Sequence, residues 1–284
     1  MITPHRYLGL GPGGFHRVAY VEWGLPGNPR VCLCVHGLTR NGRDFDELAQ
    51  ALQPQWRVVC PDVVGRGDSD RLADPAGYGY PQYLSDMTAL VARVGAARVD
   101  WVGTSMGGLI GMMMAAQQNA PIRRLVINDI GPFIPKAGLE RLASYVGKDP
   151  RFATLAEAEA ALRETANTFG LETDEEWRRF TERSVRAVGD GRYGLAYDAA
   201  IGRVFSAAPL EDIDLWAVWD KVRCPVLVLR GADSDLLTRE TAEAMKHRGP
   251  GATVVEFAGC GHAPALMDPA QIAVVRDWLT GEVR

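Results

Sequence analysis

The fold is decided by one stretch of the chain, Arg98-Val99-Asp100-Trp101-Val102-Gly103-Thr104-Ser105-Met106-Gly107-Gly108. Its apolar first half predicts a buried strand, and a helical pattern of apolar residues begins directly after it. Between them stands Gly103-x-Ser105-x-Gly107, in the strand-turn-helix context typical of a nucleophile elbow. The two glycines lack side chains, so strand and helix can approach closely around Ser105. So short a motif also occurs by chance as a Gly-rich turn, and the rest of the chain must decide.

Short apolar runs recur along the chain and alternate with helical patterns. The expected strands are Phe15–Trp23 (two short strands), Val31–Val35, Arg57–Cys60, Val99–Val102, Leu125–Ile127, Val226–Leu229 and Thr253–Phe257. The expected helices are Asp44–Leu52, Pro81–Val94, Met106–Gln118, Arg239–His247 and Pro269–Leu279. Such runs suit strands buried on both faces of a parallel sheet, and their alternation with helices predicts a doubly wound α/β fold.

The alternation breaks between Pro132 and about Arg223, where the pattern is helical and amphipathic without a convincing strand. Thr154-x-x-Glu157 and Thr173-x-x-Glu176 are capping-box signatures that mark helix starts. We therefore expect residues 1–131 and 224–284 to form the core and residues 132–223 to form a helical cap. Insertions of this kind usually cover the carboxyl ends of the strands, where ligands bind in open α/β sheets.

A nucleophilic serine needs a base to take its proton and a carboxylate to orient that base. The chain has five histidines. His262 lies in a Gly-rich loop just past the last expected strand, where a base could meet Ser105. His247 lies near the end of a charged helix, where a solvated histidine is the common case. We therefore expect His262 to be the base.

Three aspartates compete for the role of the acid. Asp233 and Asp235 follow the expected strand that precedes the His262 loop, and Asp129 ends the strand before that one. We favour Asp235, because apolar Leu236 and Leu237 follow it and suggest a position turned toward the interior. Asp233 and Asp129 remain alternatives.

An acyl-transfer site also needs N–H donors for the developing oxyanion. One is the backbone N–H of Met106, directly after the nucleophile. The second is expected from Leu38, because Gly37 permits a tight turn after the strand Val31–Val35. His36 is expected to brace this loop rather than act as a base.

The expected cap offers apolar candidates for contact with a substrate. Phe133, Trp177 and Trp216 indicate an acyl or aromatic pocket, and His36 is a further candidate for contact with the substrate. Packing within the core or the cap explains the three aromatic residues equally well.

Composition excludes several other classes of function. The 284 residues carry a formal net charge of −4, which gives no electrostatic case for binding nucleic acid or an anionic membrane. No signal peptide and no membrane-length apolar run are visible, and the five cysteines include Cys32, Cys34 and Cys60 in apolar runs typical of buried thiols. A reduced, cytoplasmic protein is therefore expected, with no metal site, since no second Cys/His cluster has zinc spacing. Whether it is a monomer or a dimer stays open.

Taken together, these residues resemble the α/β-hydrolase superfamily, specifically its cap-bearing serine esterase and lipase-like members. The resemblance covers nearly the whole chain: His36-Gly37, Asp62-Val63-Val64-Gly65-Arg66-Gly67-Asp68-Ser69, the Ser105 elbow, the Gly231–Asp235 turn and Gly261-His262. The order Ser, Asp, His is the superfamily's order. The resemblance implies the α/β-hydrolase fold, with a mostly parallel sheet and an inserted helical cap. It also implies that the Asp62–Ser69 loop is a structural turn and that the acid lies a few residues after Gly231.

The resemblance implies hydrolysis of a carboxylic ester of a small to medium, apolar molecule through an acyl-enzyme, without a cofactor. Relatives with an aspartate nucleophile, the haloalkane dehalogenases and epoxide hydrolases, are disfavoured because position 105 is serine. Hydrolases that cleave C–C bonds of ring-fission products typically carry Trp after the histidine, whereas Ala263-Pro264 follows His262. That activity and a non-catalytic ligand-binding role remain alternatives. A dinucleotide site at Gly9-x-Gly11-x-Gly13-Gly14 is rejected, because no strand precedes it and no helix follows.

Overall fold

A computed structural model describes residues 2–189 and 191–281. Within them, the main sheet has eight strands in the order β1-β2-β4-β3-β5-β6-β12-β13. The strands are β1 (Ile2–Gly11), β2 (Gly14–Trp23), β3 (Val31–Val35), β4 (Arg57–Pro61), β5 (Val99–Thr104), β6 (Ile122–Asn128), β12 (Val226–Gly231) and β13 (Thr253–Phe257). From β4 to β13 all neighbours are parallel, while β1, β2 and β4 pair antiparallel. The predicted mostly parallel α/β sheet is confirmed.

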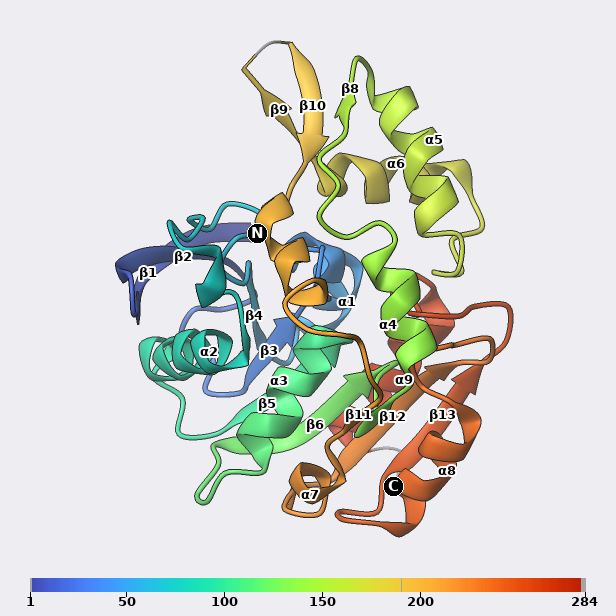
Figure 1. Cartoon of the computed structure of the whole chain (residues 1–284). Coiled ribbons are helices and arrows are strands. Elements are labelled where there is room, and N and C mark those ends of the chain that lie inside the picture. The colour runs from blue at the N-terminus through green and yellow to red at the C-terminus, as the bar shows by residue number, and fades with distance from the viewer. Residues whose placement is uncertain (1, 190, 282–284) are drawn as a thin grey trace.

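Helices cover both faces of this sheet. They are α1 (Asp46–Leu52), α2 (Tyr80–Val94), α3 (Met106–Ala115), α8 (Arg239–His247) and α9 (Pro269–Thr280). Side chains of α2, α3 and α8 join the core on one face, and those of α1 and α9 join the core on the other (Figure 1). Each of the predicted flanking helices therefore forms, and the sheet lies between two helical layers.

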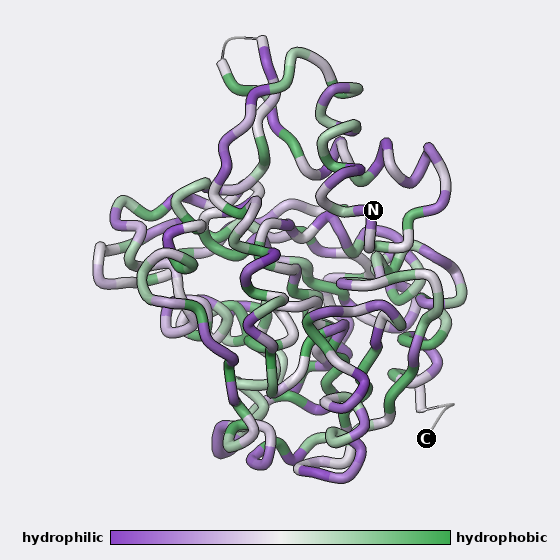
Figure 2. The backbone as a smooth tube through the Cα atoms, turned by 45° about the vertical axis from the view of Figure 1, so that its right-hand side comes forward, coloured by the Kyte–Doolittle hydropathy of each residue, from purple (hydrophilic) through white to green (hydrophobic). Residues whose placement is uncertain are grey.

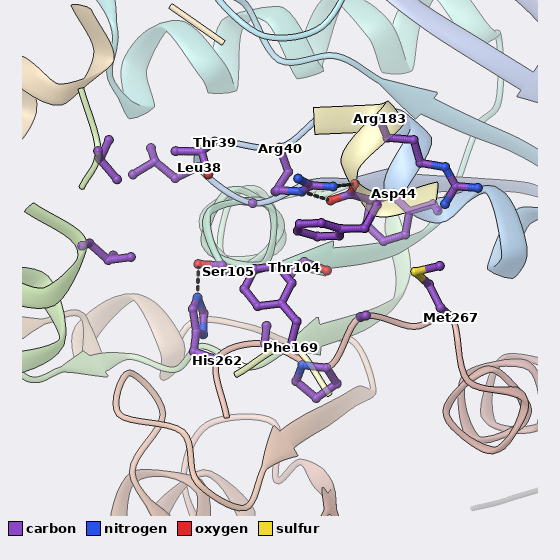
Figure 3. A pocket seen from close by; sticks show the side chains of 18 of the residues that line it. Leu38, Thr39, Arg40, Asp44, Thr104, Ser105, Phe169, Arg183, His262 and Met267 are labelled. Atoms are coloured by element: carbon purple, nitrogen blue, oxygen red, sulfur yellow. Dashed lines mark hydrogen bonds and ion pairs between the residues drawn. The ribbon is translucent and has the colours of Figure 1, made fainter. Parts of the chain in front are cut away.

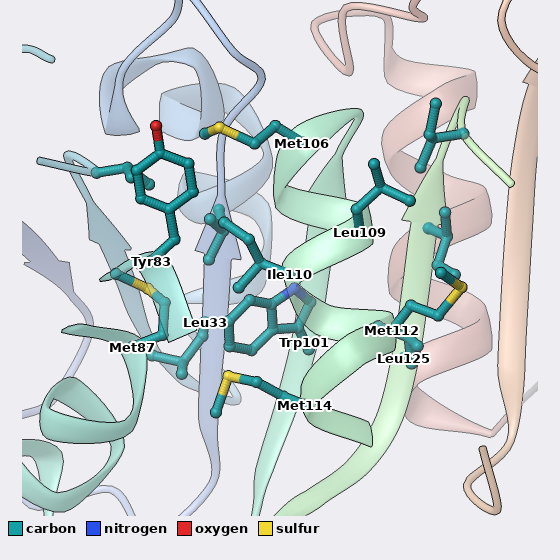
Figure 4. Close-up of a cluster of buried hydrophobic side chains, with 14 of the residues drawn as sticks. Leu33, Tyr83, Met87, Trp101, Met106, Leu109, Ile110, Met112, Met114 and Leu125 are labelled. Carbon is teal, nitrogen blue, oxygen red and sulfur yellow. The ribbon is translucent and has the colours of Figure 1, made fainter. Parts of the chain in front are cut away.

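Successive strand residues alternate between the two cores. Leu33 and Trp101 lie against α3, where Ile110 packs on them (Figure 4), whereas Cys34 and Val102 belong to the core on the opposite face. All five side chains are fully buried. Because both faces are covered, the central strands are continuous apolar runs and not alternating ones.

The first strand departs from the expectation. Two short strands were predicted within Phe15–Trp23, whereas that segment belongs to one strand, β2, which pairs with β1 in a long hairpin. β1 is an edge strand. It exposes the side chains of Leu8 and Leu10 to solvent and buries Gly9, so the large apolar residues here face outward. The glycines up to Gly14 lie in this hairpin and not between a strand and a helix, in agreement with the rejected dinucleotide site.

Residues 132–223, here called the insertion, hold a further set of elements. They are β7 (Phe133–Ile134), α4 (Lys136–Ala143), β8 (Arg151–Phe152), α5 (Leu155–Thr165), α6 (Asp174–Ser184), β9 (Val185–Val188), β10 (Arg192–Leu195), β11 (Ile213–Asp214) and α7 (Trp216–Trp219). The predicted helix starts are confirmed, because the Thr154 and Thr173 side chains accept hydrogen bonds from Glu157 N and Glu176 N. In Figure 1 most of the insertion lies on the side toward which the parallel strands point.

The insertion differs from the predicted all-helical segment in two ways. A small antiparallel sheet, β8-β10-β9, stands beside α5 and α6. These strands have two to four residues, too few to produce a readable period. At its C-terminal end, Trp219 and Val222 are fully buried in the main core, so this end of the insertion packs against the helices and strands of the core.

Hydropathy follows the same division. In Figure 2 the hydrophobic stretches, in green, run through the body of the molecule, and many outer turns are purple. Within the described ranges 2–189 and 191–281, no helix is both long and apolar enough to cross a membrane.

Candidate active site

The turn at Ser105 has the strained geometry of the predicted elbow. Ser105 joins β5 to α3 with φ 50° and ψ −115°, a conformation that non-glycine residues rarely adopt. A Cβ on Gly103 would lie 2.2 Å from Gly107 O, and one on Gly107 would lie 1.9 Å from Val35 O. The predicted need for glycine at both positions is therefore confirmed, because neither backbone contact leaves room for a side chain.

Ser105 and His262 meet as predicted, and a third residue completes a chain of hydrogen bonds. The Ser105 hydroxyl donates to His262 Nε2 over 2.9 Å (Figure 3), and His262 Nδ1 donates to Asp129 Oδ2 over 2.8 Å. His262 is 7% exposed and Asp129 is fully buried. The imidazole is thus held between a hydroxyl and a carboxylate, with each ring nitrogen in a defined role.

The prediction of Asp235 as the partner of His262 is wrong. Its carboxylate is 40% exposed and forms a two-point ion pair with Arg141 of α4, at 2.5 and 2.8 Å. Leu236 and Leu237 are buried as expected, but the preceding side chain points away from them toward the insertion. Asp233 is exposed in the same turn. The acid beside His262 is Asp129, the alternative at the end of β6.

His36 braces the loop after β3, as predicted. The fully buried imidazole donates from Nδ1 to Gly37 O over 2.7 Å and accepts from Val63 N at Nε2 over 2.9 Å. Desolvation lowers the pKa of His36 to about 3, so the ring is neutral. Its expected contact with a substrate is not found, because both ring nitrogens are used within the protein.

Asp62 organises the neighbouring loop. Its carboxylate accepts hydrogen bonds from Gly42 N at 2.7 Å and Asp68 N at 2.8 Å. Burial raises the pKa of Asp62 to about 6. These backbone contacts fit the structural turn that the sequence resemblance implies.

A cavity of about 60 Å³ lies over Ser105 and His262. From the insertion it is lined by Leu142, Tyr145, Val146, Phe169, Phe180 and Arg183, and from the core mainly by residues 37–40, Asp44, Phe45, Thr104 and residues 263–265. This volume is below the several hundred Å³ usual for ligand sites. Leu38, an expected oxyanion donor, lines the cavity beside Ser105 (Figure 3).

The aromatic residues expected to contact the substrate pack elsewhere. Trp177 lies behind Phe180, with ring centroids 5.8 Å apart, and Phe133 pairs with Asp214 between β7 and β11. Trp216 stacks under the Arg248 guanidinium at 4.2 Å. None of the three lines the cavity over Ser105, and the packing explanation holds for Trp177 and Trp216.

Arg40 is the main lining residue that the sequence did not indicate. Its guanidinium donates to Asp44 at 2.5 and 2.8 Å, donates to Ser184 of α6, and lies 3.7 Å from the Phe180 ring centroid. The side chain is 8% exposed. Arg183 of α6 forms an ion pair with Glu47 of α1. These contacts join the insertion to the core directly over the cavity.

Metal-binding side chains do not cluster in the described part of the chain. No group of three or more His, Cys, Asp or Glu residues there could hold a metal ion. Cys32, Cys34 and Cys60 are buried free thiols inside strands of the main sheet.

Comparisons with known proteins agree with this geometry. A model described as "Alpha/beta hydrolase family" matches residues 32–275. The 3-hydroxybutyrate-oligomer hydrolase of Cupriavidus necator is 48% identical over 280 residues, 96% of each chain. A putative hydrolase from Rickettsia typhi superposes with a TM-score of 0.91 at 35% identity over 100% of both chains. An alpha/beta hydrolase from Novosphingobium aromaticivorans superposes with a TM-score of 0.88 at 38% identity, over 98% of each chain.

Proposed function

This chain belongs to the alpha/beta hydrolase family, and from that premise we propose that it is a serine hydrolase of carboxylic esters. One observation carries the proposal: an unbroken hydrogen-bond chain runs from Ser105 Oγ through His262 to the buried carboxylate of Asp129. A serine, a neutral imidazole and a buried carboxylate in this order are the parts needed to activate a hydroxyl group.

The proposed reaction has two steps. His262 Nε2 takes the Ser105 proton while Oγ attacks the ester carbonyl, and Asp129 stabilises the imidazolium that forms. We propose that the tetrahedral oxyanion accepts hydrogen bonds from the N–H groups of Leu38 and Met106. His262 then protonates the leaving alcohol. A water molecule, deprotonated by His262, attacks the acyl-enzyme, releases the acid and restores Ser105.

The substrate class we propose is a short ester oligomer of a 3-hydroxy acid. Support comes from the relative named 3-hydroxybutyrate-oligomer hydrolase, which matches 96% of this chain. In such an oligomer the carboxyl group of one unit is esterified by the hydroxyl group of the next, so the bonds suit the proposed chemistry. The small, mainly apolar walls formed by Leu142, Val146 and Phe169 suit short acyl units. We propose that the insertion is the cap that selects the substrate.

The test compares the unmodified enzyme with Ser105→Ala on the linear dimer of 3-hydroxybutyrate and on 4-nitrophenyl acetate. We expect the enzyme to cleave both esters and Ser105→Ala to lose at least about a thousandfold in kcat with an unchanged melting temperature. Substantial turnover by Ser105→Ala contradicts the serine mechanism. Turnover of 4-nitrophenyl acetate without cleavage of the dimer contradicts the substrate class alone.

A ring-fission dienoate and a fluorophosphonate probe separate the alternative functions. Preferential cleavage of the dienoate over every ester identifies a C–C hydrolase. Absence of both labelling and ester turnover identifies a ligand-binding protein. The expected result is turnover of the esters and covalent labelling by the probe.

A further inference from the structure

The carboxylate of Asp129 is held by more than His262. Gly231 N donates to Oδ1 over 2.7 Å, and the Ser234 hydroxyl approaches Oδ2, the oxygen that faces His262, to 2.6 Å. Both come from the turn after β12, about a hundred residues further along the chain. Asp129 is fully buried and Ser234 is 8% exposed, so protein groups and not bulk water solvate this carboxylate.

The contacts of Ser234 fix the direction of its hydroxyl proton. Leu237 N donates to Ser234 Oγ over 3.1 Å, which uses the oxygen as an acceptor. An ionised carboxylate can only accept, so the Ser234 hydroxyl donates to Asp129. A backbone amide thus orients a hydroxyl, which in turn orients the carboxylate that orients His262.

We propose that Ser234 is a positioning residue for catalysis, which holds the Asp129 carboxylate aimed at His262 Nδ1. This inference rests on the proposed serine mechanism. Without the Ser234 donor, one carboxylate oxygen keeps His262 as its protein partner, and Gly231 N alone fixes the other. The carboxylate is then held less firmly in its orientation toward His262.

The assignment also gives the β12 turn a role different from the one expected of it. The family resemblance places the acid there, and Asp233 and Asp235 are both present, yet each is exposed. Ser234, the residue between them, is the one turned inward. In this chain the turn supplies hydrogen-bond donors to an acid that comes from β6.

Removing the donor is expected to slow chemistry without weakening substrate binding. Ser234→Ala should lower kcat on 4-nitrophenyl acetate by about tenfold, the effect of losing one charge-assisted hydrogen bond, and leave KM within about twofold. The loss should fall on kcat and not on KM, because Ser234 does not line the cavity and acts only through Asp129 and His262.

The other groups near His262 stay in place during this test. Asp235 and Arg141 face it from the β12 turn and α4, and both are retained in the variant. The Cys260 thiol stays neutral because burial raises its pKa to about 11. The change in kcat therefore reports on the loss of the contact between Ser234 and Asp129.

Two further variants make the test decisive. Asp233→Asn changes an exposed neighbour in the same turn and should keep the kcat and KM of the unmodified enzyme. Ser234→Cys keeps the approximate side-chain volume but has a weaker hydrogen-bond donor, so its kcat should fall less than that of Ser234→Ala. It also replaces Ser234→Ala if that variant fails to fold. Active-site titration with a fluorophosphonate corrects each kcat for the fraction of competent enzyme.

A corrected kcat within about twofold of the unmodified enzyme, or a loss that appears in KM and not in kcat, overturns the role of Ser234. Such a result leaves the loss of activity in Ser105→Ala intact. Failure of the serine mechanism appears instead as retained turnover in Ser105→Ala, so the two failures are distinguishable.

Discussion

His262 Nδ1 lies 2.8 Å from Asp129 Oδ2, so the carboxylate that pairs with His262 stands at the end of β6, next to the strand that leads into Ser105. β5 and β6 are parallel neighbours, so their carboxyl ends lie at the same edge of the sheet. Ser105 and Asp129 therefore come from adjacent strand ends. His262 reaches between them from the loop after β13.

Asp129→Asn should abolish most of the activity. An amide cannot stabilise the imidazolium and favours the wrong tautomer of His262, and such a change lowers kcat by about 10⁴-fold in a serine triad. Asp235→Asn, the matched control, should stay within a few-fold, because its side chain pairs with Arg141 in a half-exposed position. Steady-state kinetics on 4-nitrophenyl acetate measures both losses of kcat. A larger loss in Asp235→Asn than in Asp129→Asn would contradict the pairing of Asp129 with His262 in catalysis.

Gly107→Ala should prevent stable folding. Its Cβ would lie 1.9 Å from Val35 O, a backbone atom of the central strand β3 that cannot move aside. Gly37→Ala is the control beside the same site, since its Cβ would meet nothing closer than 3.7 Å. Melting temperatures measured by circular dichroism should fall steeply for the first variant and little for the second. Equal melting temperatures would mean that the elbow is looser than described.

His36 should make stability depend on pH. Its pKa is about 3 in the folded chain and near 6.5 when unfolded, so the unfolded chain binds more protons between these values. The stability it contributes is complete above pH 6.5 and is lost by about 1.4 kcal/mol for each unit below. His36→Gln should be less stable at pH 7 but should lose less on acidification. Asp62, whose raised pKa acts in the opposite sense, is present in both proteins and cancels.

Urea unfolding of both proteins between about pH 5 and pH 7.5 measures this difference. The gap in free energy of unfolding should narrow as the pH falls through this range. A gap independent of pH means that His36 does not carry the titration.

Phe169→Ala should widen the acyl specificity. Phe169 lines the cavity and meets Phe180 edge to face, so its removal enlarges the space near Ser105. The kcat/KM ratio of 4-nitrophenyl hexanoate to the acetate should rise by about tenfold, a typical gain when a pocket admits additional methylene groups. Phe133→Leu, outside the cavity, should leave the ratio unchanged. An equal rise in both variants would contradict the described cavity.

The local sequence pattern was sufficient to predict that Ser105 and His262 meet. It was insufficient to predict which carboxylate pairs with His262. Ser105 lies between two glycines that the backbone requires, and His262 lies in a Gly-rich loop after a strand, so each has a signal within a few residues. Asp129, Asp233 and Asp235 all follow strand ends. The direction of each side chain depends on the residue with which it pairs, which is His262 for Asp129 and Arg141 for Asp235. These pairs form only in the tertiary structure.

The residues that line the cavity could not be predicted from the sequence for a similar reason. Trp177 and Phe180 are three residues apart on one apolar face of α6, and helical periodicity treats them alike. The placement of the helix decides that Phe180 faces the cavity and Trp177 lies behind it. Arg40 gave no signal, because its contacts in the insertion, Phe180 and Ser184, are distant in sequence and only the fold brings them to it.

The central claim is that Ser105 is a nucleophile activated by His262. The most direct measurement is reaction with a fluorophosphonate followed by peptide mass spectrometry, with Ser105→Ala and His262→Ala treated in parallel. We predict one adduct per chain on the peptide that carries Ser105, no adduct in Ser105→Ala, and strongly slowed labelling in His262→Ala. An adduct on another residue, or ester hydrolysis that persists in Ser105→Ala, would contradict the account.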